Sequence, residues 1–203
     1  YDPSEGEVLL DGIPLRRLDP RPLRSAIGTV PQDSFLFSET LLENIGLGIQ
    51  EDAEPRAPLT GEGRSRVEEA ARVAQLHDTV MEFPRGYETF LGERGINLSG
   101  GQKQRAALAR ALARDPSILI LDDALSAVDT HTEARILADL RTVLAGRTSF
   151  IISHRVSAVM NADQILVLED GEIVERGTHE ELLALEATYA NLLRRQMLEE
   201  ELE

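Results

Sequence analysis

Short apolar runs recur along the chain, and segments with helical spacing lie between them. The runs that predict β-strands are Val8–Leu10, Ile27–Val30, Ile118–Leu121, Ser149–Ile152, Gln164–Glu169 and Glu172–Glu175. The segments that predict helices are Arg21–Ala26, Leu41–Ile45, Arg64–Leu76, Ser99–Arg114, His131–Leu144 and Val156–Met160. Strands and helices that alternate in this way predict an α/β fold, in which helices flank a mainly parallel sheet on both sides.

Turn and cap residues refine this outline. An Asp-Gly pair at residues 11–12 predicts a small antiparallel β part near the N-terminus, and a second pair at residues 170–171 predicts a hairpin. Thr178 and Glu181 have the spacing of a capping box, which indicates where the last helix begins. Gln50–Gly63 is rich in proline, glycine and acidic residues and therefore indicates a surface loop.

Composition narrows the classes of function. The 203 residues are 42% hydrophobic, which suffices for one domain with a sizeable core, and they contain no cysteine for disulfides or thiolate metal sites. The formal net charge is −15, whereas non-specific nucleic-acid binding requires a basic surface, so we expect no nucleic-acid partner. ATP binding remains open, because backbone N–H groups and a metal ion can hold phosphates on an acidic protein.

The stretch ILILDD, residues 118–123, ends an apolar strand with two carboxylates. Side chains at the carboxyl end of a parallel strand lie at the ligand edge of the sheet, so Asp122 is a candidate ligand of Mg²⁺. In P-loop ATPases, such a carboxylate holds the Mg²⁺ that bridges the β- and γ-phosphates of ATP. The alternative is an acid that merely ends the strand and caps the next turn, and this stretch alone leaves both open.

The stretch LSGGQKQR, residues 98–105, begins a long alanine-rich helix. Gly100 and Gly101 let the backbone approach a ligand closely, Ser99 adds a hydroxyl, and the helix N-terminus adds free N–H groups. Together these groups predict a clamp for a terminal phosphate. An ordinary helix start with Ser99 as its N-cap is the alternative, and a bare S-G-G pattern favours it.

The full set of motifs resembles the ATP-binding cassette (ABC) family over nearly the whole chain. The order is VPQD, LSGGQ, ILILDD, SAVD and IISHR. The resemblance implies that Gln32 is the Q-loop glutamine, which contacts Mg²⁺ and the attacking water. It also implies that SAVD, which ends at Asp129, is the D-loop that crosses to a partner subunit, and that His154 contacts the γ-phosphate.

The resemblance also implies a fold, cofactors and a partner chain. The fold is a P-loop-type sheet with a core lobe at about residues 1–32 and 116–203, and a helical subdomain at about residues 33–115 that carries LSGGQ. The cofactors are ATP and Mg²⁺, with Asp122 and Gln32 on the metal. Two cassettes sandwich two ATP molecules, and Ser99, Gly100, Gly101 and Gln102 of one chain complete the site of the other.

TFLGERG, residues 89–95, resembles the loop before the signature in the exporter branch of this family, as do DPSEGEVLLDG and FLFSETLLENI. The resemblance implies an exporter of drugs, lipids or peptides whose cassette lies on the cytoplasmic side of the cell (inner) membrane. The cassette then contacts its own transmembrane domain through the Gln32 and Glu93 loops. A glycine-rich loop with a solvated Glu93 is the alternative.

The first departure from the family is an absent motif. The residues contain no phosphate-binding GxxGxGK[ST] loop, which in the family would lie shortly upstream of YDPSEG. We therefore expect the chain to be a piece of a longer nucleotide-binding domain. By themselves, these 203 residues are expected to bind ATP very weakly and to hydrolyse none detectably, because the lysine and the backbone nest are missing.

The second departure is Asp123, which stands where the family has the glutamate that polarises the attacking water. Aspartate is shorter by one methylene, roughly 1.5 Å of reach. A displacement of about 1 Å can cost on the order of 10²-fold in rate when catalysis depends on positioning. An intact LSGGQ beside a weakened carboxylate predicts one half of an asymmetric heterodimer, in which Asp123, His154 and Gln32 form the degenerate site.

Two other functions remain open. One is a regulatory or structural cassette, which dimerises and lends its signature motif to a partner without doing chemistry. The other is a soluble ABC ATPase that acts on DNA or ribosomes, which the acidic charge and TFLGERG both disfavour. His77, His131 and His179 match no motif and are expected to be ordinary surface residues.

Overall fold

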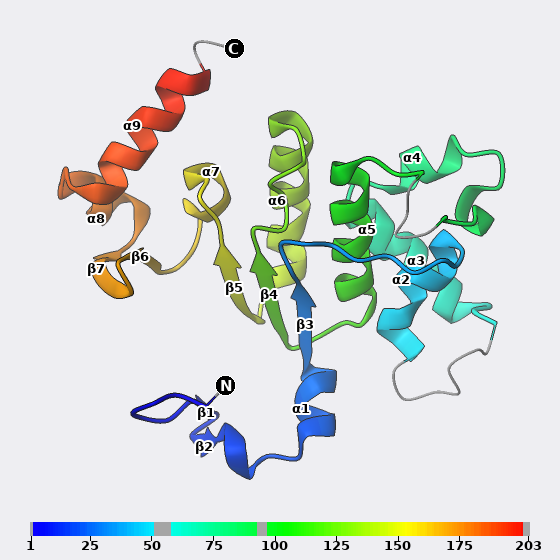
Figure 1. Ribbon diagram of the computed structural model, residues 1–203, viewed down its shortest axis with the longest axis horizontal. Helices are drawn as coiled ribbons and strands as arrows, with labels where there is room; N and C mark the ends of the chain where they lie inside the picture. Colours follow the sequence, from blue (N-terminus) through cyan, green and yellow to red (C-terminus); the bar gives the residue numbers. More distant parts are fainter. Residues whose placement is uncertain (1, 51–57, 93–96, 201–203) are drawn as a thin grey trace.

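The computed structural model describes residues 2–50, 58–92 and 97–200. A three-stranded parallel sheet lies at its centre (Figure 1), in the order β3-β4-β5. The strands are β3 (Ile27–Val30), β4 (Ile118–Asp122) and β5 (Thr148–Ile152). Val30 pairs with Leu121, and Asp122 pairs with Ile152, so the three strands end at the same edge of the sheet. The parallel α/β architecture expected from the sequence is therefore confirmed.

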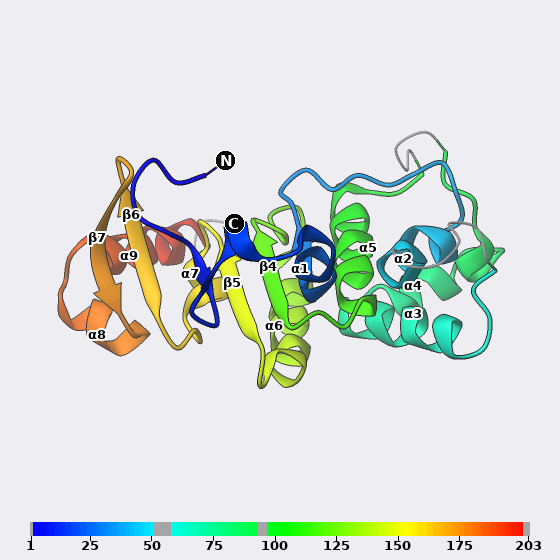
Figure 2. The same cartoon turned by 90° about the horizontal axis from the view of Figure 1, so that it is seen from below.

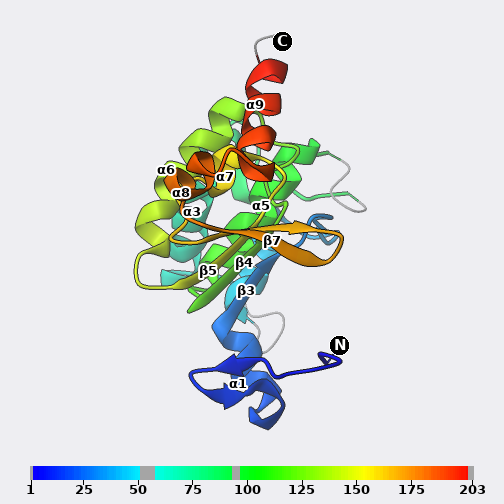
Figure 3. The ribbon, with the colours of Figure 1, turned by 90° about the vertical axis from the view of Figure 1, so that its left-hand side faces the viewer.

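Two long helices cover one face of this sheet. They are α5 (Gly100–Ala113) and α6 (Thr130–Leu144), and Figure 3 shows α6 beside the strands. Leu119 and Leu121 are buried against these helices, whereas Ile118 and Ile120, which point to the other face, are only half-buried. The four apolar residues of β4 predicted that both faces of the strand are covered. Among the described residues, the face that carries Ile118 and Ile120 is covered only in part.

Three shorter helices lie beside α5 at one end of the molecule (Figure 2). They are α2 (Leu41–Gln50), α3 (Glu62–Val73) and α4 (His77–Met81). A Cβ atom on Gly48 would lie 2.1 Å from the Arg110 carbonyl oxygen, so glycine at this position permits the close approach of α2 to α5. The sequence predicted one helix over Arg64–Leu76, but α3 ends at Val73, because Gln75 adopts a φ of 51°, and α4 begins beyond the predicted segment at His77.

The C-terminal part has its own small core, at the opposite end in Figure 2. Its elements are α7 (Val156–Val159), β6 (Ile165–Glu169), β7 (Glu172–Gly177), α8 (His179–Ala184) and α9 (Thr188–Glu200). The predicted hairpin is confirmed, with Asp170 and Gly171 at positive φ. Among the described residues β6 pairs only with β7, so its expected place in the parallel sheet was wrong.

The ends of the elements follow local chemistry. The capping box of Thr178 and Glu181 is confirmed at the start of α8, but a further helix follows it, because Glu186 adopts a φ of 52° and breaks the segment in two. Near the N-terminus, β1 (Leu9–Leu10) and β2 (Ile13–Pro14) form the predicted antiparallel pair. Helix α1 (Pro20–Ala26) follows, with the Asp19 side chain as its N-cap.

Two of the three unassigned histidines have structural partners. Nδ1 of His77 lies 2.8 Å from the Tyr87 hydroxyl, and Nδ1 of His179 lies 2.8 Å from the Tyr189 hydroxyl. Both tyrosines are buried, so each hydroxyl needs such a partner, and the expectation that His77 and His179 are ordinary surface residues was wrong. His131 is exposed at the start of α6, as expected.

Within the described ranges, no helix combines the length and the apolar composition that a membrane crossing requires.

Candidate functional site

Three polar side chains from different strands meet at the carboxyl edge of the sheet. Gln32 follows β3 by two residues, Asp123 follows β4 directly, and His154 follows β5 by two residues. The parallel register brings these strand ends together, although 91 positions separate Gln32 from Asp123 and 31 separate Asp123 from His154. The structure therefore assembles the three residues that the resemblance assigns to catalysis.

Asp123 is the centre of this group. Its backbone N–H donates to the Ile152 carbonyl at 2.8 Å, and its φ of 47° lies in the left-handed region, which aspartate tolerates better than most residues. One carboxylate oxygen lies 3.0 Å from Nδ1 of His154, and the other accepts from the Gln32 side chain at 3.4 Å. The carboxylate is 17% exposed, so it is shielded but within reach of solvent.

Asp122, the candidate metal ligand, ends β4 and is exposed at the same edge. The described residues contain no group of three or more His, Cys, Asp or Glu side chains able to hold a metal ion. Mg²⁺ usually binds one or two protein carboxylates and takes its other oxygen ligands from water and phosphates. An exposed Asp122 with the Gln32 amide nearby fits that donor pattern, and a closed all-protein metal site does not.

The start of α5 has the geometry of an N-cap. The Ser99 hydroxyl accepts from the Gln102 N–H at 3.2 Å, and the Ser99 N–H donates to the Gln102 side chain at 2.9 Å, which completes a capping box. Both side chains thus have structural partners, as the alternative interpretation of S-G-G expected. Ser99 and Gly100 are nevertheless exposed at the positive end of a 14-residue helix.

The two signature glycines pack against SAVD, residues 126–129, which we call the D-loop. A Cβ atom on Gly101 would lie 2.7 Å from the Ala127 carbonyl oxygen, and one on Gly100 would lie 3.3 Å from the Ala127 Cβ. Gly101 therefore has a packing role that the sequence interpretation, which considered only close approach to a ligand, did not include.

We expect Gly101→Ala to lower the free energy of unfolding by about 1–3 kcal/mol, because the D-loop backbone must move to relieve the overlap. Gly100→Ala is the matched control, since its new methyl group meets only a side-chain carbon at 3.3 Å. Denaturant unfolding of the two variants measures the difference. Equal losses would contradict this account of Gly101.

A buried glutamine and a partly buried arginine hold the D-loop. From α5, the Gln104 side chain donates to the Ser126 hydroxyl at 2.9 Å and accepts from the Ala127 N–H at 2.8 Å. From the segment after β5, the Arg155 guanidinium donates to the Ser126 and Val128 carbonyls at 3.2 and 3.3 Å. The D-loop is therefore linked both to the signature helix and to the residue after His154.

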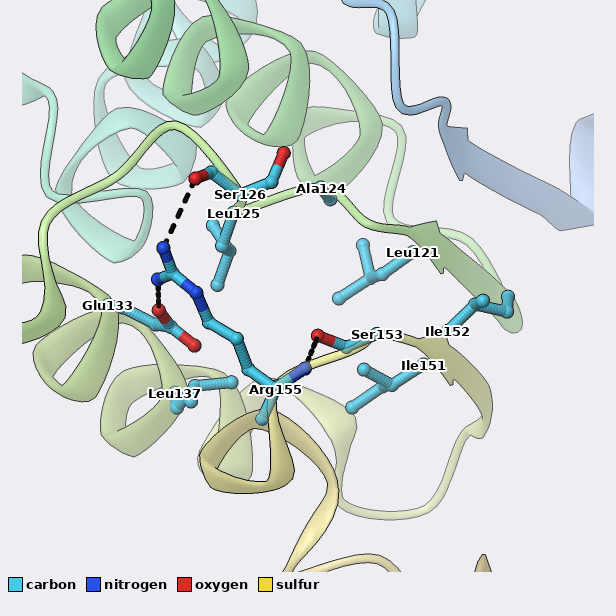
Figure 4. Close-up of a pocket in the computed structure, with 11 residues that line it drawn as sticks. Leu121, Ala124, Leu125, Ser126, Glu133, Leu137, Ile151, Ile152, Ser153 and Arg155 are labelled. Atoms are coloured by element: carbon cyan, nitrogen blue, oxygen red, sulfur yellow. Dashed lines mark hydrogen bonds and ion pairs between the residues drawn. The ribbon is translucent and has the colours of Figure 1, made fainter. Parts of the chain in front are cut away.

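Arg155 also forms an ion pair with Glu133 of α6, which is almost completely buried (Figure 4). The two side chains border a cavity of about 20 Å³ between β4, β5 and α6, which has room for about one water molecule and none for a nucleotide. Sequence analysis missed Gln104 and Arg155. Both lie inside quoted motifs, LSGGQKQR and IISHR, but nothing in the sequence distinguishes them from exposed polar residues.

Asp129 ends the D-loop and caps α6. Its carboxylate accepts from the Thr132 N–H at 2.9 Å, and hydrogen bonding from Thr132 holds the pKa of Asp129 below its usual value. The residue is exposed and is therefore ionised at neutral pH. Glu93, the other interface candidate, lies outside the described residues.

A parallel sheet with an exposed carboxylate at its edge, beside a glycine-rich helix start, defines a nucleotide-binding α/β domain of the cassette class. The chain belongs to the ABC transporter family, because residues 1–126 match the sequence model of that family, described as "ABC transporter". Within that family, the chain is similar to a protein named for multidrug resistance and to a solved ABC exporter.

Among curated proteins, the chain is 47% identical to "Multidrug resistance protein 1" of Entamoeba histolytica, over its whole length and 15% of that protein. It is 46% identical to "ATP-binding cassette sub-family B member 6" of Homo sapiens, over 99% of the chain and 23% of that protein. A solved structure of a bacterial Atm1-family ABC exporter with ATP bound matches with a TM-score of 0.87 and 43% identity, over 97% of the chain and 33% of the other. The chain thus spans a third or less of these proteins.

Proposed function

We propose that this chain binds ATP and Mg²⁺ at the carboxyl edge of its sheet and couples them to export across a membrane. The convergence of Gln32, Asp123 and His154 is the observation that carries the proposal. The similarity to a solved ABC exporter supports the transport role. The residues themselves contain no GxxGxGK[ST] segment, so the activity is proposed for the assembled transporter and not for this chain by itself.

Each residue at the sheet edge has a distinct task in this proposal. Asp122 and the Gln32 amide would hold the metal ion, and the metal would supply positive charge to the terminal phosphates of bound ATP. The Asp123 carboxylate orients the attacking water together with Gln32. It also accepts a hydrogen bond from the N–H at Nδ1 of His154, which fixes the orientation of the imidazole ring toward the γ-phosphate.

The site on this chain is proposed to be degenerate. The Asp123 carboxylate is one methylene shorter than the usual glutamate, and its oxygens are already in contact with Gln32 and His154. It therefore stops short of the position that in-line attack on the phosphate requires. ATP is retained because Asp122 is present, but it is hydrolysed slowly.

The rest of the proposed interface concerns a partner cassette. Ser99–Gln102 and the D-loop complete the hydrolytically competent site of a second, non-identical chain, with Asp129 reaching across the interface. The exposure of Ser99, Gly100 and Asp129 supports this role, as does the rigid attachment of the D-loop to α5 through Gln104.

Contact with the transmembrane domain is proposed at an exposed aromatic face. The rings of Phe35 and Phe37 meet edge to face with centroids 4.9 Å apart, and both side chains are about half exposed. Phe90, also half exposed, belongs to the segment bridged to Thr40 and leads towards Glu93. Exposed aromatic residues that lie close together favour a protein interface.

A partly buried arginine fixes this face to the signature helix. Arg110 of α5 donates to the Phe35 carbonyl at 2.9 Å and to the Asn44 carbonyl at 2.7 Å. Burial lowers the pKa of Arg110 to about 10, so its charge persists at neutral pH. A displacement of Phe35 by the membrane domain would therefore be transmitted to α5. We also propose the division into a core lobe (about 1–32 and 116–203) and a helical subdomain (about 33–115), and a place for the cassette on the cytoplasmic side of the cell (inner) membrane.

We expect the double variant Phe35→Ala with Phe90→Ala to reduce transport-coupled ATP hydrolysis about 5- to 30-fold. The reason is that truncating aromatic residues at the centre of an interface weakens the binding of the two partners by a factor of about this size. The assay is substrate-stimulated ATPase activity of the full transporter in lipid vesicles. Ile173→Ala is the matched control, since Ile173 is equally exposed but lies on β7. Unchanged coupling in the double variant would contradict the docking face.

Photolabelling with an azido-ATP analogue tests the central proposal. After turnover by the assembled transporter, this chain should retain labelled ATP, whereas its partner should hold labelled ADP. The alternative is a regulatory or structural cassette that only lends its signature to the partner. It predicts no label on this chain, although the partner still turns over.

A further inference from the structure

The segment that carries His154, residues 153–155, is held by a side chain from the C-terminal helix. Gln196 of α9 donates from its amide nitrogen to the His154 carbonyl at 2.5 Å. The Gln196 amide oxygen accepts from the Val156 N–H at 2.8 Å. One side chain thus bonds the backbone on both sides of Arg155, across about 40 positions of sequence.

A primary amide suits this pair of contacts, which needs one donor and one acceptor. The His154 carbonyl and the Val156 N–H lie between the end of β5 and the start of α7, where neither strand nor helix bonding satisfies them. Glutamine supplies one donor and one acceptor on the same planar group. Glutamate has the acceptor but no donor, and leucine of similar size has neither.

The helix that carries Gln196 is itself firmly attached. The Glu175 carboxylate of β7 accepts from the N–H groups of Thr188 and Tyr189, which begin α9. Tyr189 is buried in the C-terminal core, and its hydroxyl contacts His179 of α8. Gln196 therefore connects residues 153–155 to a braced helix and not to a loose tail.

The imidazole of His154 depends on that connection. Its side chain is 65% exposed, and the contact that the structure records for it is the one to Asp123. With so little packing around the ring, the position of the backbone decides where the ring lies.

We propose that Gln196 is a positioning residue for His154, so that the C-terminal helix α9 belongs to the nucleotide site. A displacement of α9 would move the His154 backbone and weaken the hold on ATP. The inference rests on the proposed function, since it assumes that His154 contacts the nucleotide.

The test uses the full transporter and four variants. Gln196→Leu removes both hydrogen bonds, and Gln196→Glu keeps only the one from the Val156 N–H. Arg195→Leu, on the adjacent exposed position of α9, is the matched control. His154→Ala is made alone and combined with Gln196→Leu.

The first measurement is hydrogen exchange of the Val156 amide, without nucleotide. It should accelerate in Gln196→Leu and remain slow in both Arg195→Leu and Gln196→Glu. The second measurement is the azido-ATP concentration that half-saturates photolabelling of this chain. It should rise about 5-fold in Gln196→Leu, as expected for the loss of two ordinary hydrogen bonds. Gln196→Glu should also weaken labelling, because its carboxylate faces the His154 carbonyl.

The double variant separates positioning from general stability. If Gln196 acts through His154, Gln196→Leu should have no further effect on labelling once His154→Ala is present. Equal effects in both backgrounds, or a fall in melting temperature that accounts for the whole loss, would overturn the proposal. Failure of the wild-type chain to label with azido-ATP would instead refute the proposed function, and the exchange result would then still show whether Gln196 holds the segment.

Discussion

Asp123→Glu is expected to raise ATP hydrolysis at this chain's site about 10- to 100-fold in the assembled transporter. The added methylene extends the carboxylate by roughly 1.5 Å, and displacements of about 1 Å can change rates by on the order of 10²-fold when catalysis depends on positioning. The structure sharpens this expectation. The shorter carboxylate now lies 3.0 Å from His154 and 3.4 Å from Gln32, so a longer one would extend past both.

The backbone opposes part of this gain. Asp123 has a φ of 47°, a region that costs a longer side chain roughly 1–2 kcal/mol. This cost falls on folding stability and not on the reach of the carboxylate, so the gain in rate should persist while the melting temperature drops slightly.

Single-site turnover decides the outcome, measured after the partner's catalytic carboxylate has been removed. Asp123→Asn is the control, because it keeps the length and removes the charge, and it should show no gain. No increase in Asp123→Glu would refute the argument from reach. Loss of all turnover on Asp123→Ala, with the partner intact, would refute the degenerate site itself.

The sheet edge could be predicted from sequence because its signals are local. Apolar runs in the sequence located β3, β4 and β5. A polar residue that follows such a run by one or two positions lies at the carboxyl end of the strand. A parallel arrangement then brings Gln32, Asp123 and His154 to one edge. Their mutual contacts confirm that they meet, although their roles in chemistry remain proposals.

The contacts that hold this edge could not be predicted, because they join residues far apart in sequence. In the sequence, nothing distinguishes these residues from other polar residues of helices and loops. Only the folded chain shows that Gln104 and Arg155 bond the backbone of the D-loop and that Gln196 bonds the backbone of the His154 segment. The hairpin of β6 with β7 was predicted from its Asp-Gly turn and is confirmed, but among the described residues β6 is absent from the parallel sheet in which the alternating pattern placed it. Its apolar pattern fits a parallel or an antiparallel strand equally, so the pattern by itself could not exclude β6 from that sheet.

Arg155→Met is expected to lower the free energy of unfolding by about 3–5 kcal/mol, the usual cost of leaving a buried charge without its partner. Glu133 is 3% exposed and would keep only a long contact of 3.5 Å from the Ser157 hydroxyl. The Ser126 and Val128 carbonyls would lose their donor as well, so the D-loop should loosen. Denaturant unfolding followed by circular dichroism of the nucleotide-binding domain measures the loss.

The double variant Arg155→Met with Glu133→Met should recover much of this stability, because two apolar side chains of similar volume then replace the ion pair. Arg16→Met is the surface control; it breaks an exposed pair with Glu7 and should cost less than about 1 kcal/mol. Additive losses in the double variant would contradict the coupling between Arg155 and Glu133. If folding recovers while the partner's site stays inactive, then Arg155 contributes to function through the D-loop carbonyls that it binds, separately from its contribution to stability.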